Sequence, residues 1–224
     1  MMKRRIVLTE DGSSSLFVED IQEHFHSHFG AIQEAQHIFI QNGLYEKMRS
    51  ELKEISILEI GFGTGLNCFL TLIESVNSSI SVYYEGIEKY PLSKEEYNQL
   101  NYASVFDPNQ QHLFDKLHES PWEVPNTILP KFELFKRACS FETATFDFNT
   151  FDLVYFDPFS PDKQPEMWEL PVIQKVYDSM KPGAILMTYC TKGIVKRTFK
   201  AIGFQIEKLP GPKGKREILK VIKI

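Results

Sequence analysis

The stretch Glu59-Ile-Gly-Phe-Gly-Thr-Gly65 decides the fold of this chain. It follows an apolar run from Ile55 to Leu58 and precedes a helix-like segment from Leu66 to Val76. This order of apolar run, glycine turn and helix is typical of a strand that ends at a ligand-binding loop. Glycines suit such a loop because they carry no Cβ, so a ligand can approach the backbone closely.

The glycine spacing indicates which kind of ligand the loop holds. It is G-x-G-x-G, whereas dinucleotide-binding folds carry G-x-G-x-x-G. The shorter spacing suits a cofactor with an amino-acid tail and no pyrophosphate, which points to S-adenosyl-L-methionine (SAM). The next apolar strand ends at an acidic residue that can take both ribose hydroxyls. We therefore expect cofactor contacts from Glu59, Gly61, Gly63, Gly65, Asn67 and Glu88. The alternatives are that the glycines form only a tight turn and that Glu59 caps the loop's own amides.

Composition sets the class of protein. The chain has 224 residues, which is enough for one α/β domain and too few for two enzymatic ones. No apolar run approaches the roughly 18 residues of a membrane helix, and the N-terminus lacks the apolar core of a signal peptide. The three cysteines form no CxxC pair, and no histidine cluster lies near them in the sequence. Neither a zinc site nor a disulfide framework is therefore indicated. We expect a cytoplasmic protein without a metal or a membrane segment.

Strand and helix patterns alternate from Ile57 onward, which indicates parallel strands joined by crossover helices and an α/β fold. The expected strands are Ile57–Ile60, Val82–Glu88, Phe132–Arg137, Leu153–Asp157, Ile185–Tyr189, Phe204–Glu207 and Ile218–Ile222.

The N-terminal part of the chain shows a different pattern. Residues Arg4 to Asp20 predict a hairpin, and Ala31 to Gln41 predict a helix that stops at Asn42-Gly43. We expect one domain over residues 1–224, with a hairpin and helix decoration over residues 1–50 and a helical insertion over residues 102–130.

Asp157 is the candidate catalytic residue. It follows the buried run Leu153 to Phe156 and precedes Pro158, which favours an extended backbone. Open parallel sheets bind ligands at the carboxyl ends of their strands, so Asp157 should lie near the glycine loop. An acid there can accept the proton that a primary alkylamine must lose before it attacks a methyl group. The alternative is a carboxylate that only caps the next helix.

The C-terminal residues are basic although the chain is acidic. From Lys192 to Ile224 there are ten Lys or Arg and two Glu, whereas the formal net charge of the chain is −5. Such asymmetry can make a face that holds nucleic-acid phosphates. The candidates for substrate binding are Lys196, Arg197, Lys213, Lys215 and Arg216, with Trp168 as a surface on which a base can stack. The alternatives are that the basic residues belong to a solvated helix and edge strand, and that Trp168 is a hydrophobic plug at a helix start.

Several further stretches carry a family resemblance. They are His26-Ser-His-Phe-Gly-Ala31 with Glu34, Glu88-Lys-Tyr-Pro-Leu92, Asp157-Pro-Phe-Ser-Pro161 with Gln164-Pro-Glu-Met-Trp168, and Gly214-Lys-Arg-Glu217. Together with the glycine loop, they resemble the SAM-dependent methyltransferase domain of the bacterial tRNA 5-methylaminomethyl-2-thiouridine methyltransferases. The resemblance runs from about His24 to Ile222.

The resemblance implies a Rossmann-like class I SAM-dependent methyltransferase, with a mostly parallel seven-stranded sheet, helices on both faces and an antiparallel last strand. It implies SAM contacts by Gly61, Gly63, Asn67 and Glu88 and a catalytic Asp157. The implied substrate is the primary amine of 5-aminomethyl-2-thiouridine at the tRNA wobble position. Because many members also carry a flavin-dependent oxidase domain, we expect a separate enzyme to supply the aminomethyl group here. The alternatives are a methyltransferase of a small-molecule or protein amine and a non-catalytic module that binds SAM or RNA.

Overall fold

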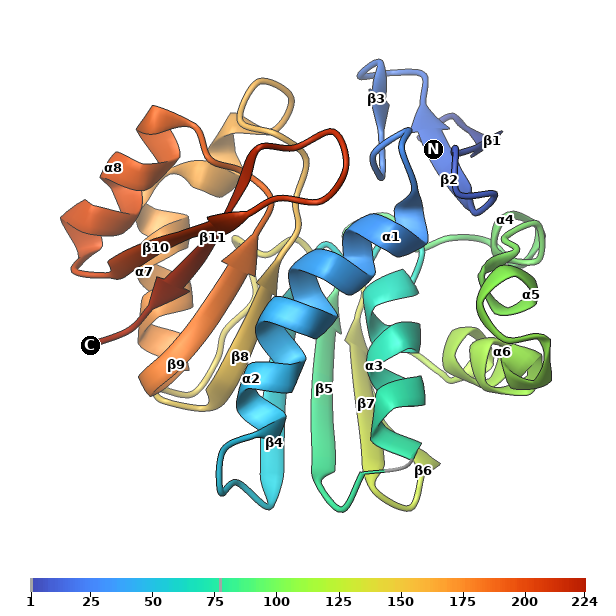
Figure 1. Cartoon of the computed structure of the whole chain (residues 1–224), viewed down its shortest axis with the longest axis horizontal. Helices are drawn as coiled ribbons and strands as arrows, with labels where there is room; N and C mark the ends of the chain where they lie inside the picture. Colours follow the sequence, from blue (N-terminus) through green and yellow to red (C-terminus); the bar gives the residue numbers. More distant parts are fainter. Residues whose placement is uncertain (1, 77) are drawn as a thin grey trace.

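The computed structural model describes residues 2–76 and 78–224, and its centre is a twisted sheet of eight strands (Figure 1). In spatial order these are β10 (Gln205–Pro210), β11 (Glu217–Ile222), β9 (Met180–Thr188), β8 (Phe151–Phe156), β4 (Glu54–Ile60), β5 (Ser81–Ile87), β7 (Phe132–Arg137) and β6 (Pro125–Leu129). The five strands from β9 to β7 pair in parallel, and β11 runs antiparallel to both of its neighbours. The expected α/β class is therefore confirmed.

The sheet has one strand more than expected. The additional strand, β6, pairs antiparallel with β7 at one edge and lies in the segment 102–130, where we expected helices and loops. That segment also holds α5 (Tyr102–Phe106), the 3₁₀ turn η2 (Pro108–Gln110) and α6 (Gln111–Glu119). Only Ile128 of β6 is fully buried, so the strand carries no alternating apolar pattern. It begins with Pro125, which lacks a backbone donor and is tolerated at a sheet edge.

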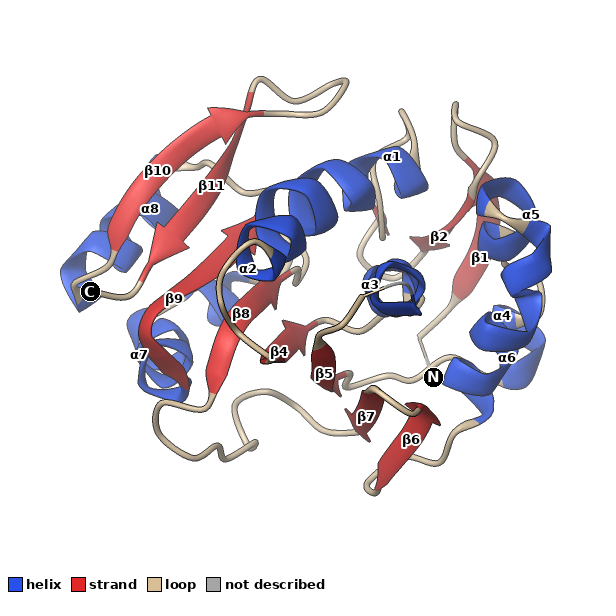
Figure 2. Ribbon diagram, turned by 60° about the horizontal axis from the view of Figure 1, so that its bottom comes forward, coloured by secondary structure: helices blue, strands red, loops and turns tan. Residues whose placement is uncertain are grey.

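Helices cover both faces of the sheet, as Figure 2 shows. One face carries the helical run that begins at α1 together with α3 (Leu66–Val76), and the other carries α7 (Leu170–Ser179) and α8 (Gly193–Ile202). Alternate residues of a strand pack into two separate hydrophobic cores, one on each face of the sheet. Ile57 lies in the first core and Leu58 in the second. This alternation is the period of two that a strand imposes on its side chains. The remaining short elements are α4 (Lys94–Tyr97) and η3 (Pro165–Trp168).

The early helix continues beyond its expected end. The run comprises α1 (Ala31–Ala35), the π-helical η1 (Gln36–Leu44) and α2 (Tyr45–Met48), so Asn42-Gly43 does not stop it. A Cβ at Gly43 would lie 3.0 Å from Cγ of Met187 on β9. This glycine therefore lets the helix approach the sheet closely, a role that local sequence does not distinguish from a helix stop.

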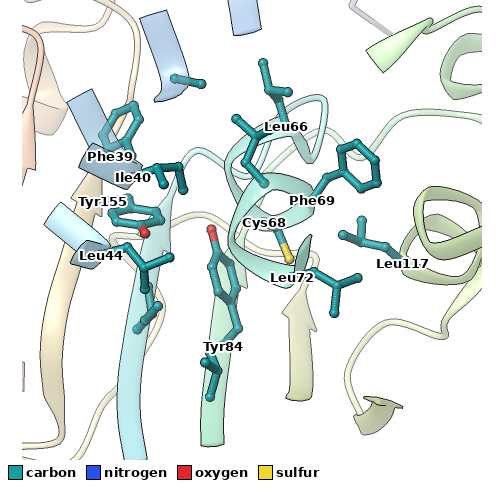
Figure 3. Close-up of a cluster of buried hydrophobic side chains, with 14 of the residues drawn as sticks. Phe39, Ile40, Leu44, Leu66, Cys68, Phe69, Leu72, Tyr84, Leu117 and Tyr155 are labelled. Carbon is teal, nitrogen blue, oxygen red and sulfur yellow. The ribbon is translucent and has the colours of Figure 1, made fainter. Parts of the chain in front are cut away.

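Aromatic and aliphatic side chains fill the space between this helix and α3. Figure 3 shows Phe39 and Leu44 on one side, Phe69 and Leu72 on the other, and Tyr84 rising from the sheet between them. All five are nearly or fully buried. Burial of side chains of this size stabilises the fold by about 1.5–3 kcal/mol each, which holds the end of β4 and its loop in place.

A small antiparallel sheet stands beyond the carboxyl ends of the parallel strands (Figure 1). It consists of β1 (Arg4–Leu8), β2 (Ser14–Val18) and β3 (Glu23–His24). The pairing of β1 with β2 confirms the expected hairpin. Whether residues 1–50 and 102–130 are additions to a common domain stays a prediction.

Candidate functional site

The glycine loop is held open by its backbone conformation. Gly61, Gly63 and Gly65 have φ angles of +90°, +52° and +71°, which side chains with a Cβ rarely adopt. A Cβ at Gly61 would lie only 2.7 Å from the carbonyl oxygen of Asp157. The backbone N–H groups of Gly61 and Phe62 donate to the carbonyl of Ile87, at 3.1 and 3.0 Å. These bonds fix the loop against the end of β5.

A cavity of about 460 Å³ opens above this loop, and we call it the main cavity. The structure brings the expected catalytic residue and four of the expected cofactor contacts to its wall, which are Asp157, Gly61, Gly63, Asn67 and Glu88. They come from the ends of three neighbouring strands and from the first turn of α3. Their convergence follows from the parallel sheet, because all these carboxyl ends lie at one edge.

Glu88 faces the main cavity with a carboxylate that is already oriented. One oxygen accepts the N–H of Gly63 at 2.9 Å, and the other accepts the N–H of Tyr90 at 2.8 Å. An ionised carboxylate has about four acceptor positions, so two remain for other donors. Glu88 can therefore fix the glycine loop and still receive a pair of hydroxyl groups.

Glu59 lies behind the cavity wall. Its side chain is 0% exposed, and Oε2 accepts the hydroxyl of Tyr84 at 2.8 Å. Burial raises the pKa of Glu59 well above its usual range, so its neutral form is favoured. Oε1 of Glu59 and Oδ1 of Asn67 have no hydrogen-bond donor among the described residues. Glu59 therefore lies behind Asn67. Neither Glu59 nor Gly65, both expected as cofactor contacts, is among the described residues that line the main cavity.

Asp157 is held from two sides. Its N–H donates to the carbonyl of Ile60 at 3.0 Å, and its Oδ2 accepts Nδ2 of Asn67 at 3.2 Å. Loss of solvent raises the pKa of Asp157 well above its usual range, and the negative charge of Glu34 raises it further. A carboxylate with a raised pKa is a stronger proton acceptor, which suits acid–base work near neutral pH.

The structure corrects the expectation for Trp168. Its side chain is 4% exposed, and its Nε1–H donates to the carbonyl of Phe159 at 2.9 Å. The indole packs edge-on against Phe156, with ring centroids 5.0 Å apart. Its faces are therefore occupied by protein, and Trp168 supports the wall instead of offering a surface to a base.

Two of the basic candidates are paired with carboxylates. Lys213 lies 2.7 Å from Oε2 of Glu10 on the surface, and Lys215 lies 3.0 Å from Oε1 of Glu34 at the main cavity. Lys215 thus lies in an ion pair at the main cavity, and its expected phosphate contact stays a prediction. It points inward because the loop 211–216 packs on Phe29, where a Cβ at Gly214 would approach within 2.0 Å.

The other basic candidates lie away from the main cavity wall. Lys196 and Arg197 are on α8, half-buried and exposed respectively, and Arg216 is exposed beside Lys215. The structure leaves Arg197 and Arg216 open to solvent, so both are available to an external anion.

The main cavity also contains residues that the sequence analysis missed. Cys139, Ser140 and Phe141 follow β7, and Phe25 and His26 come from the segment after the small sheet. The first group could have been found, since every strand of this sheet delivers residues to the same edge. The second could not, because it reaches the site through contacts between segments far apart in the chain.

Residues 134–224 match a family described as S-adenosyl-L-methionine-dependent methyltransferase. A protein of Cupriavidus metallidurans named tRNA 5-methylaminomethyl-2-thiouridine biosynthesis bifunctional protein MnmC is 32% identical over 228 residues, covering 95% of this chain and 33% of the relative. The protein of that name from Leptospira interrogans is 28% identical over 214 residues, covering 90% and 32%. Residues 134–224 of this chain thus belong to the SAM-dependent methyltransferase family. The chain spans about a third of the length of these curated relatives.

Solved structures show the same fold as this methyltransferase. The crystal structure of MNMC2 from Aquifex aeolicus matches with a TM-score of 0.82 and 23% identity, covering 99% of this chain and 70% of that chain. Spermidine synthase from Thermotoga maritima matches with a TM-score of 0.55 and 13% identity, covering 99% and 74%. The expected Rossmann-like class I fold is thus confirmed, with eight strands in place of seven.

The cofactor of the family is SAM, and the residues of the main cavity fit it. The positive φ angles of the glycine loop leave its backbone open to close approach. Glu88 keeps acceptor positions for two ribose hydroxyls, and Asn67 lies in the first turn of α3 on the cavity wall. These residues would hold SAM between the ends of β4 and β5.

Within residues 2–76 and 78–224, no group of three or more His, Cys, Asp or Glu side chains is placed to hold a metal ion. None of the helices in the same residues is long and apolar enough to cross a membrane.

Proposed function

We propose that this methyltransferase converts the 5-aminomethyl group of (2-thio)uridine at the tRNA wobble position to 5-methylaminomethyl. The observation that carries the proposal is Asp157, a carboxylate of raised pKa on the wall of the main cavity. The names of the curated relatives, which refer to biosynthesis of 5-methylaminomethyl-2-thiouridine, support the same substrate. A tRNA substrate would place the activity in the cytoplasm.

The chemistry asks for a proton acceptor and for alignment. A primary alkylamine is largely protonated at neutral pH, because its pKa is close to the ~10.4 of lysine. Asp157 would take that proton and leave the nitrogen lone pair free. When bound, SAM would supply the methyl group from its sulfonium, with the carbon–sulfur electrons going to sulfur as the new nitrogen–carbon bond forms. Asn67, bonded to Asp157, would keep the acceptor oriented toward the reacting nitrogen.

Exposed basic groups are the proposed contacts for the tRNA backbone. Arg197 on α8 and Arg216 in the loop 211–216 are exposed, and Lys196 lies beside Arg197. Phosphate contacts of this kind set the position of a nucleic acid without reading its sequence. Selection of the wobble base would then fall to the main cavity.

The test is to identify the modified nucleoside. The purified protein would be incubated with isotope-labelled SAM and tRNA from cells that lack this activity, and the tRNA would then be digested to nucleosides. Label in 5-methylaminomethyluridine or its 2-thio form is expected for the wild type and not for Asp157→Asn. Label in another nucleoside, or SAM binding without label in tRNA, would overturn the proposal.

A further inference from the structure

Glu34 is a cavity carboxylate to which the proposed function has assigned no role. It lies on α1, and its side chain is 12% exposed at the wall of the main cavity. Its Oε2 accepts the backbone N–H of Ser27 at 2.7 Å, which fixes the direction of the carboxylate. Its Oε1 is buried and accepts no hydrogen bond from the described residues, although Nζ of Lys215 lies 3.0 Å away.

Lys215 enters the main cavity from the opposite end of the chain. Its ammonium lies over the ring of Tyr189, 4.8 Å from the centroid, and its side chain is 29% exposed. The hydroxyl of Tyr189 donates to the carbonyl of Pro158, next to Asp157, at 2.9 Å. The two carboxylates and this lysine therefore form one electrostatic group, in which Glu34 and Lys215 act on Asp157 in opposite directions.

We propose that Glu34 is a second substrate-binding carboxylate, which together with Asp157 receives the substrate amine in its protonated form. This inference rests on the proposed function and adds how the amine is selected. Lys215 is the cation that neutralises Glu34 before the substrate enters. When Asp157 is ionised, the group carries two negative charges and one positive charge, so an entering ammonium completes the balance.

The two carboxylates have different tasks in this arrangement. An ammonium has three N–H donors, which is enough to bond both carboxylates at once. The proton leaves along the bond to Asp157, whose carboxylate becomes a neutral acid as the nitrogen becomes neutral. Glu34 is a positioning residue at that moment, because it still accepts a hydrogen bond and points the lone pair away from itself.

A purely structural role for the Glu34–Lys215 pair explains the geometry less well. Removing two charges from water costs more than a partly buried pair usually returns, so apolar side chains would hold the loop 211–216 at least as firmly. Phe29 already supplies an apolar contact to that loop at Gly214. A charged pair at a ligand-binding wall is better explained by the charge of the ligand.

The experiment compares two ligands that differ only at the wobble base. Dissociation constants would be measured, with S-adenosylhomocysteine present to prevent reaction, for a tRNA that carries 5-aminomethyluridine and for the same tRNA with plain uridine. The ratio of the two constants isolates the aminomethyl group because phosphate contacts cancel. Wild type, Glu34→Gln and Lys215→Met would be compared with Glu119→Gln, which removes one negative charge from an exposed pair with Lys94.

Opposite changes are expected at the two ends of the ion pair. Glu34→Gln should lower the preference for the aminomethyl tRNA by about tenfold, which is about 1.4 kcal/mol. Lys215→Met should raise it, since both carboxylates are then left for the ligand. Glu119→Gln should leave the ratio unchanged. The unfolding midpoint of each variant would show whether it is folded. If Glu34→Gln does not fold, the test is decided by whether Lys215→Met raises the preference for the aminomethyl tRNA.

Failure of this inference and failure of the proposed function give different results. If the wild type methylates the aminomethyl tRNA but Glu34→Gln keeps its full preference, Glu34 only holds the loop and the inference is overturned. The same holds if Lys215→Met lowers the ratio. If the wild type neither prefers nor methylates the aminomethyl tRNA, the proposed function itself is wrong.

Discussion

Substitution of Gly61 by alanine tests how the glycine loop holds SAM. The residue has a φ of +90°, and its added Cβ would lie 2.7 Å from the carbonyl oxygen of Asp157. Two separate costs therefore follow, one from the backbone conformation and one from the overlap with the strand that carries the proposed catalytic acid.

The structure provides a control that separates these costs. Gly203, at the C-terminal end of α8, has a φ of +109°, but its Cβ would meet no atom within 4 Å. Each substitution should cost about 1–3 kcal/mol for the left-handed backbone. Only Gly61→Ala must also open a contact from 2.7 Å to an ordinary 3.4 Å, a shift of about 0.7 Å that the close-packed interior resists. The loop would move and lose about one hydrogen bond or more to SAM, so its dissociation constant should rise about tenfold.

Two measurements check this reasoning. Chemical denaturation gives the free energy of unfolding, and isothermal titration calorimetry gives the affinity for SAM. Both variants should lose stability, whereas only Gly61→Ala should lose SAM affinity. Wild-type affinity in Gly61→Ala, or an equal loss of affinity in Gly203→Ala, would refute the role given to the loop.

Three further predictions concern charge. Asp157→Asn should keep SAM affinity and lose turnover. Because the pKa of Asp157 is raised in the folded state, the wild type should lose stability as pH rises above about 3.8, the ordinary value for Asp. The variant should therefore be more stable than the wild type at pH 7 and equally stable below pH ~3.8. Lys136 is fully buried, and burial lowers its pKa to about 8 from 10.5, so stability should rise with pH between these values in wild type but not in Lys136→Met. Lys196→Glu with Arg197→Glu should weaken tRNA binding and reduce the slope of log affinity against log salt by about 2, as measured by filter binding.

Each of these has an outcome that would contradict it. Retained turnover in Asp157→Asn would remove it as the proton acceptor. Parallel stability curves above pH 8 for wild type and Lys136→Met would show that this lysine titrates normally. An unaltered salt slope would place α8 outside the tRNA interface.

The centre of the fold could be predicted from the sequence because local patterns control it. The segment from Leu66 to Val76 coincides with α3, and Glu88 and Asp157 meet the glycine loop as expected. Apolar runs define the strands, and a parallel sheet then brings their carboxyl ends together whatever the remaining contacts are. The geometry of the site thus depends on the order and direction of the strands, which local sequence patterns indicate.

The rest depended on contacts that no local pattern records. Gly43 has the sequence of a helix stop, but its closeness to Met187 makes it part of a continuous helix. Lys215 belongs by composition to a basic surface, yet the packing of its loop on Phe29 turns it toward Glu34. In each case a tertiary contact between distant segments outweighs the local preference.

The position of β11 has a consequence for how the protein is made. This strand follows β10 in the sequence, yet it lies between β9 and β10 and pairs with both. On the ribosome, the edge of β9 would stay unpaired until β11 emerges, and an open edge of this kind attracts other chains. The loop 211–216 is placed by the same strand, so Lys215 reaches the main cavity only after β9 and β10 have been made. A nascent chain would thus acquire its glycine loop before its full substrate site.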